Sequence, residues 1–162
     1  NSVLKQYILK GYAVNDNRIK QLGDVIRIMK RTESELDSQQ VLSVIEHHGL
    51  CVEHLPSGID TLSIVVSSEQ LKGGLLSDVI NEIRENVSPD YIQVVENISL
   101  IATVGHGMTR RPGTAGKLFN SLAEAGINII MIDQGSSELN IIIGVANSDY
   151  EKCIRTIYKA FV

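Results

Sequence analysis

The sequence has few aromatic residues and no excess of positive charge, and both shortages exclude functions. Five tyrosines, two phenylalanines and no tryptophan are spread over 162 residues, which leaves few rings for stacking nucleobases. The formal net charge is −4, whereas a nucleic-acid-binding face is usually basic. We therefore expect no nucleic-acid partner. A ferredoxin-like RNA-binding sheet is the weakest alternative, because the aromatic strand motif of that class is also missing.

Long apolar runs and a cysteine framework are missing as well. The apolar stretches, such as INIIMI and LNIIIGVA, are far shorter than the roughly 18 residues that a membrane-spanning helix needs, so we expect no membrane partner. Cys51 and Cys153 each lie in an apolar stretch and indicate buried free thiols in a reducing compartment. No signal peptide is visible, and since the first residue is Asn1 we expect a piece of a longer protein.

The remaining composition is that of a globular protein, and the chain contains an internal repeat. Hydrophobic residues make up 43% of the sequence, which is enough for a packed core. Residues 48–67 align without a gap on residues 125–144, at an offset of 77 positions. The matching pairs are Gly49 with Gly126, Gly58 with Gly135, Leu62 with Leu139 and Ile64 with Ile141. We interpret the two segments as copies of one structural unit.

Each copy is predicted to run strand, helix, strand, strand, helix. In the first copy, Asp37 and Gln40 have the spacing of a capping box, and Gly49 is a typical helix stop. The expected strands are 25–29, 50–55 and 61–67 in the first copy and 98–104, 127–133 and 139–145 in the second. The expected helices are 37–48 and 75–83, and then 114–125 and a last helix that ends near residue 161.

The number of strands predicts how the two copies are connected. A βαββαβ sheet needs four strands in each copy. The first copy has its fourth strand at 91–95, whereas the second copy reaches the end of the sequence with three. We therefore expect the N-terminal segment to complete the second sheet. The predicted fold is α+β, with two ferredoxin-like antiparallel sheets, helices on one face of each, and the first unit (16–96) inserted in the second (1–15 plus 97–162).

No catalytic or metal-binding motif is found in the sequence. The histidines at 47, 48, 54 and 106 have no metal-ligand spacing relative to the cysteines. No serine lies in a G-x-S-x-G motif, and the glycines at 105 and 107 do not complete a phosphate-binding loop. We expect no catalytic residue, no metal and no cofactor in this chain.

The loop between the first strand and the first helix is the polar segment of each copy. It ends at a helix N-terminus, where N–H groups and the helix dipole favour an anion. In the first copy this loop carries Glu33, Glu35 and Asp37, and Glu53 lies on the neighbouring strand. A ligand with a carboxylate and amines would suit such a site. The alternative interpretation is a solvated acidic loop. In the second copy a Pro-Gly turn at 112–113 lets a ligand approach the backbone.

Three segments of the sequence resemble one known family. They are ISLIATVGHGM, RPGTAGKLFNSLAEAGINIIMIDQGSSELNIIIGV and the ending IRTIYKAFV. All three resemble the C-terminal regulatory region of aspartate kinases (aspartokinases), which is a tandem of ACT domains, small βαββαβ modules that sense amino acids. The segment HLPSGID resembles the lysine-responsive, monofunctional group, and the chain end at residue 162 agrees with the monofunctional enzymes.

The resemblance implies an allosteric function and an architecture. One ACT unit is inserted in the other, and ACT units pair across the subunits of a cytoplasmic homodimer. The expected effectors are lysine, threonine or both, and a relative such as diaminopimelate stays open. The parent enzyme would phosphorylate the side-chain carboxylate of aspartate with ATP and magnesium in its own kinase domain, a partner of this non-catalytic part. The alternative is a structural dimerisation module of the same enzyme that binds no effector.

The resemblance also implies the site residues. In the family, the effector contacts the strand–helix loop of one first ACT unit and the second strand and turn of the other. By position these contacts are Met29, Ser34, Asp37 and Ser38 from the loop, and Val52, Glu53, Ser57, Gly58 and Ile59 from the partner's strand and turn. Leu36 stands where many members carry glycine, which puts close approach of the effector in doubt. A second candidate site would contain Gly113, Thr114, Asn128 and Ile129.

Overall fold

The computed structural model of the chain describes residues 23–30, 36–58, 60–105, 108, 110–136 and 138–161. The chain divides into two compact units. We call Gln21–Ile98 the first unit and the part that contains Ser99–Val162 the second unit. The expectation that residues 1–15 supply a strand of the second sheet lies outside the described residues and stays a prediction.

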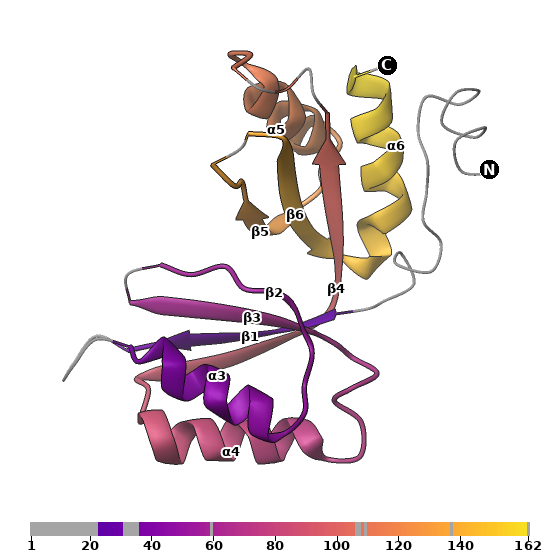
Figure 1. Ribbon diagram of the computed structural model, residues 1–162. Helices are drawn as coiled ribbons and strands as arrows, with labels where there is room; N and C mark the ends of the chain where they lie inside the picture. Colours follow the sequence, from indigo (N-terminus) through magenta and orange to yellow (C-terminus); the bar gives the residue numbers. More distant parts are fainter. Residues whose placement is uncertain are drawn as a thin grey trace, which may run out of the picture. The chain divides into compact units, whose positions relative to one another are not determined.

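The first unit is a sheet covered by two helices (Figure 1). Its elements are β1 (Gly23–Met29), α3 (Ser38–His47), β2 (Val52–His54), β3 (Thr61–Ser67), α4 (Leu75–Val87) and the start of β4 (Tyr91–Val104). The strand order is β2-β3-β1-β4, and β1 pairs antiparallel with both β3 and β4. α3 and α4 cover the same face of this sheet (Figure 1), as the predicted α+β class requires.

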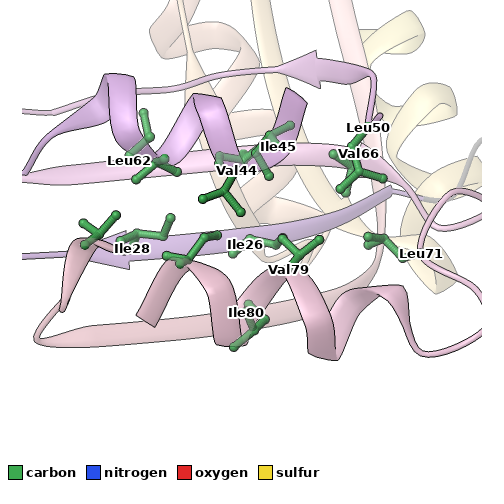
Figure 2. Packing of buried hydrophobic residues seen from close by; sticks show 14 residues of the cluster. Ile26, Ile28, Val44, Ile45, Leu50, Leu62, Val66, Leu71, Val79 and Ile80 are labelled. Carbon is green, nitrogen blue, oxygen red and sulfur yellow. The ribbon is translucent and has the colours of Figure 1, made fainter. Parts of the chain in front are cut away.

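The core of the first unit lies between the sheet and its helices, as Figure 2 shows. The buried positions of α3 are Val41, Val44 and Ile45, which follow the i, i+3, i+4 spacing of one helix face. On β1, Ile26 and Ile28 are also buried and contribute to the same cluster. The helical periodicity of α3 and the alternation along β1 therefore direct their apolar side chains into the same layer.

The second unit repeats this architecture with the rest of β4. Its further elements are α5 (Thr114–Glu124), β5 (Ile129–Asp133), β6 (Asn140–Ala146), the 3₁₀ turn η2 (Asn147–Asp149) and α6 (Tyr150–Phe161). The strand order is β4-β6-β5. Its core includes Leu118 and Leu122 of α5, Ile141 and Ile143 of β6, and Cys153 of α6. None of the helices described in either unit has the length and hydropathy needed to cross a bilayer.

The first helix ends in the same way in both units. Gly49 and Gly126 both have a φ of +65°, a left-handed conformation that glycine adopts without a steric penalty. The Gly49 N–H donates to the Glu46 carbonyl at 2.8 Å, and the Gly126 N–H donates to the Ala123 carbonyl at 2.9 Å. Up to this point the repeat offset of 77 positions is confirmed.

Beyond the turn between β2 and β3, however, the gapless alignment of the two copies is wrong by two positions. Val52 pairs with Val66, whereas Ile129 at the equivalent position pairs with Val145. The connection from Ile129 to Val145 is therefore two residues longer than the connection from Val52 to Val66. Leu62 is therefore equivalent to buried Ile141, and Leu139 is 38% exposed. A slip of two keeps every side chain on its face of the sheet, so the hydrophobic pattern gave no sign of it.

Two further expectations are corrected by the structure. Residues 91–95 and 98–104 are not separate strands, since β4 is continuous over 14 residues. An extra β4 residue opposite Asp24 forms a bulge, where the Asp24 carboxylate accepts a hydrogen bond from the Asn97 N–H at 3.2 Å.

The second correction concerns Cys51, which is exposed rather than buried. It precedes the edge strand β2, where its backbone bonds the side chain of Gln70.

Candidate functional site

The start of α3 is closed by its own side chain. Asp37 is the N-cap residue, and its Oδ1 accepts hydrogen bonds from the N–H groups of Gln39 at 2.9 Å and Gln40 at 3.2 Å. These are two of the amides that lack a partner within the helix. Asp37 is thus confirmed as the N-cap residue of α3. The carboxylate of Asp37 therefore occupies the place where an anionic ligand would bind the helix N-terminus.

Leu36 also fixes this helix start. It is half-buried and packs against the core cluster that contains Val41. With Asp37 as the N-cap, Leu36 precedes the cap and Val41 is the fourth helical residue, which is the arrangement of a hydrophobic staple. The leucine that departs from the family pattern thus has a packing role.

The residues predicted for the effector site fall into two groups within one copy. Met29 ends β1 opposite Thr61, and the Lys30 N–H donates to the Asp60 carbonyl at 3.2 Å, so the end of β1 adjoins the turn that carries Ser57. Val52 and Glu53 belong to β2, and Val52 lies level with Val66, which pairs with Asp24 at the start of β1.

The distance between these groups follows from the strand geometry. Five residues of β1 separate the level of Asp24 from that of Met29, which corresponds to roughly 16 Å at about 3.3 Å per residue. We call Met29, Asp37 and Ser38 the loop group, and Val52 and Glu53 the strand group. Ser57 and Gly58 lie on the turn after β2, where Ser57 pairs with Leu62, which pairs with Ile28 near the end of β1. Apart from half-buried Met29, all of these predicted site residues are exposed. Ser34 and Ile59 lie outside the described residues.

The second unit has a cavity at the start of α5. Its volume is about 350 Å³, and Gly113 and Thr114 line it. Gly113 is the N-cap, with a φ of +87° and no side-chain capping bond. Asn128 and Ile129, the other residues predicted for the second site, are not among the residues that line this cavity.

Several further residues that line this cavity were not assigned to the second site from the sequence. The cavity is also lined by Arg110, Gln134 and Glu138, and the Glu138 carboxylate accepts a hydrogen bond from the Arg110 N–H at 2.7 Å. Gln134 and Glu138 come from the turn between β5 and β6, in which the gapless repeat alignment loses register. Arginines at 110 and 111 beside an open helix start make this cavity suited to an anion.

A cluster of titratable groups lies elsewhere in the first unit, between α3 and α4. His47 Nδ1 is 3.0 Å from Glu82 Oε1, and His48 Nε2 is 2.7 Å from Glu82 Oε2. Burial alone would raise the pKa of the Glu82 carboxyl, but the hydrogen bonds and charges of the two imidazoles outweigh it and lower that pKa overall. The sequence could not reveal this cluster, because Glu82 is 34 residues from His48.

Comparison with known proteins identifies the relatives of the chain. Residues 101–161 match the ACT domain family. Aspartokinase 3 of Bacillus subtilis is 36% identical over 123 residues, which are 76% of this chain and 27% of that protein. The crystal structure of Clostridium acetobutylicum aspartate kinase, described as an important allosteric enzyme, is 41% identical with a TM-score of 0.79. That match covers 88% of this chain and 33% of the other.

A more distant structure shares the fold alone. Escherichia coli aspartokinase III in complex with lysine and aspartate, in its T-state, has a TM-score of 0.68 at 18% identity. The match covers 87% of this chain and 32% of the other. The chain spans between 27% and 33% of the length of these three relatives. It is a homologue of the regulatory region of aspartokinases, and residues 101–161 belong to the ACT domain family.

Proposed function

We propose that this chain is the amino-acid-sensing regulatory part of an aspartokinase and mediates feedback inhibition by lysine. The observation that carries the proposal is the division of the predicted site into a loop group and a strand group. Because these groups lie roughly 16 Å apart in one copy, a site that uses both requires two copies. The proposal therefore includes a homodimer that pairs through the first units.

The charges of the first unit favour a ligand with a second amine. The Asp37 carboxylate already accepts two N–H groups of α3, so the helix start offers less to the carboxylate of an effector. Glu53 is an exposed acid on the edge strand β2, suited to an ammonium group. Lysine carries two amines and threonine one, which supports lysine as the effector. The fold is shared with the lysine-bound Escherichia coli enzyme.

The cavity of the second unit is a second candidate site. It presents arginines and the uncapped start of α5, which suit the carboxylate of a small amino acid such as threonine. The family resemblance ranks this site below the first, and the cavity is the specific observation in its favour. Dual sensing of lysine and threonine would use one site in each unit.

In the parent enzyme, the sensor would act on a kinase domain in the remainder of a longer chain. That domain would bind ATP and magnesium and phosphorylate the side-chain carboxylate of aspartate, in the cytoplasm. Effector binding inhibits only if the effector has different affinities for the active and inactive arrangements. The alternative function is a structural dimerisation module, which the anchoring of the first loop by Leu36 supports.

Thermal unfolding of the chain with lysine, threonine or both tests the proposal. An effector at 100 times its dissociation constant stabilises the folded state by about 2.7 kcal/mol, which corresponds to a rise in Tm of roughly 5–10 °C at this size. We expect this shift with lysine. We expect Glu53→Gln to reduce it, and the matched variant Glu85→Gln, on the exposed face of α4, to leave it unchanged.

The other outcomes separate the alternatives. A shift that requires threonine and survives Glu53→Gln would move the sensing site to the second unit. If no amino acid shifts the Tm while the chain sediments as a dimer, the structural module is the better description. A monomer that binds lysine with full affinity would contradict the two-copy site.

A further inference from the structure

We propose that His47, His48 and Glu82 form a binding site for a divalent transition-metal ion of the zinc type. This goes beyond amino-acid sensing and involves none of the residues of the effector site. His47 ends α3, His48 is its C-cap, and Glu82 lies within α4. One donor atom from each of the three side chains lies within 4.8 Å of the other two.

The donor atoms already lie close to one another. Glu82 Oε1 is 3.0 Å from His47 Nδ1, and Glu82 Oε2 is 2.7 Å from His48 Nε2. A zinc ion bound at about 2.0–2.2 Å in tetrahedral geometry needs its donors roughly 3.3 Å apart. Small rotations of the three side chains would therefore convert the hydrogen-bonded arrangement into a coordinating one.

The donor set has the chemistry of a known ligand class. Two imidazoles and one carboxylate are the protein ligands of many zinc sites that keep a fourth position open for water. Neutral imidazoles present lone pairs to the metal, so the ion replaces the protons that the histidines otherwise share with Glu82. The net charge of the ligand set is then −1, which suits a divalent cation.

The surroundings favour a cation and allow its entry. The donors lie at the C-terminal end of α3, where the helix dipole is negative. The His47 side chain is 71% exposed, whereas His48 and Glu82 are 16% and 27% exposed. Two partly buried donors would fix the ion and the exposed one would leave it accessible. A bound ion would link the end of α3 to α4 across 34 residues of chain.

Calorimetric titration of the chelator-treated chain with Zn²⁺ tests the site. We expect one saturable ion per chain and a rise in Tm of several degrees at saturation. Glu82→Gln keeps the size of the side chain but removes its charge, and should lower the affinity roughly tenfold or more. Glu85→Gln, an acid-to-amide change on the same helix, should bind like the wild type.

Two results would overturn the proposal. One is a wild-type chain without saturable Zn²⁺ binding, and the other is equal affinity in the Glu82→Gln and Glu85→Gln variants. If Glu82→Gln fails to fold, the wild-type chain still decides the question by NMR with substoichiometric Co²⁺. Broadening centred on the amides of His47, His48 and Glu82 supports the site. Broadening centred on the amide of exposed Cys51 contradicts it.

Discussion

The two units share a fold but differ at the start of their first helix. In the first unit, Asp37 caps α3 with its own carboxylate and Leu36 packs against the core. In the second unit, the cap of α5 is Gly113, with a φ of +87° and no side-chain capping bond. One helix start is thus closed by the sequence itself, and the other opens into a cavity of about 350 Å³.

This difference shows that the start of a helix can serve either the stability of the fold or the binding of a ligand. A capped and stapled helix start stabilises the fold locally but leaves fewer N–H groups for an anion. An uncapped start leaves those groups available. Repeated units can therefore keep one architecture while a change at two or three positions alters what each can bind. The first unit then depends on its exposed acids, and the second on its arginines and backbone.

The largest expected contrast is between two glycines of the second unit. Gly113→Ala places a Cβ on a left-handed residue and should cost about 1–2 kcal/mol. Gly116 is helical, with nothing within 4 Å of an added Cβ, so Gly116→Ala should stabilise by about 0.5–1 kcal/mol. Urea unfolding measures both. If the two variants change stability in the same direction, the left-handed cap of α5 is not a real constraint.

Leu36→Gly makes the first loop resemble the second at the equivalent position. It removes a half-buried leucine and adds backbone freedom to the unfolded state, so it should cost about 2 kcal/mol. The midpoint of chemical denaturation measures this loss. A loss below about 0.5 kcal/mol would mean that Leu36 does not anchor the loop. Tighter lysine binding by the variant would show that this anchor limits access of the effector.

Asp37→Ala tests the closed helix start directly. Loss of the cap should cost about 1 kcal/mol, whereas Asp37→Asn keeps a capping oxygen and should cost less. Thermal unfolding at fixed pH compares the two variants, with exposed Ser38→Ala as a near-neutral control. Equal stability of Asp37→Ala and the wild type would remove the main distinction between the two units.

The smallest expected effect concerns the two cysteines, because alkylation of the folded chain leaves the fold unchanged. Burial, together with the negative charge of Asp149, raises the pKa of the Cys153 thiol to about 11, so at about pH 8 almost none of it is the reactive thiolate. Cys51 is exposed. We expect an alkylating reagent to modify one thiol in the folded chain and the second only in denaturant. Equally fast modification of both would mean that the core of the second unit opens readily.

Much of the fold could be predicted because its signals are local. The capping spacing at Asp37 and the glycine after each first helix mark boundaries that neighbouring residues determine. The slip of the repeat could not be predicted, because an insertion of two residues preserves the alternation of buried and exposed positions. At the bulge of β4, the Asn97 N–H donates to Asp24, a contact between residues far apart in the sequence that no local pattern indicates.

The candidate site was predictable only in part, for the same reason. Gly113 and Thr114 were assigned from the Pro-Gly turn, and both line the cavity. Glu138 was missed because its role depends on a turn whose length the repeat alignment misjudged. The partner of His48 was missed because Glu82 approaches it only after α3 and α4 pack on one sheet.

The most direct test is an NMR titration of the chain with lysine, in which backbone amide shifts identify the residues that respond. The account predicts saturable shifts in the loop group (Met29, Asp37 and Ser38), in the strand group (Val52 and Glu53) and in the turn residues Ser57 and Gly58. Because the two groups belong to different copies, both should saturate together in a dimer. Shifts confined to Gly113, Thr114 and Glu138, or no shifts at all, would contradict lysine sensing by the first unit.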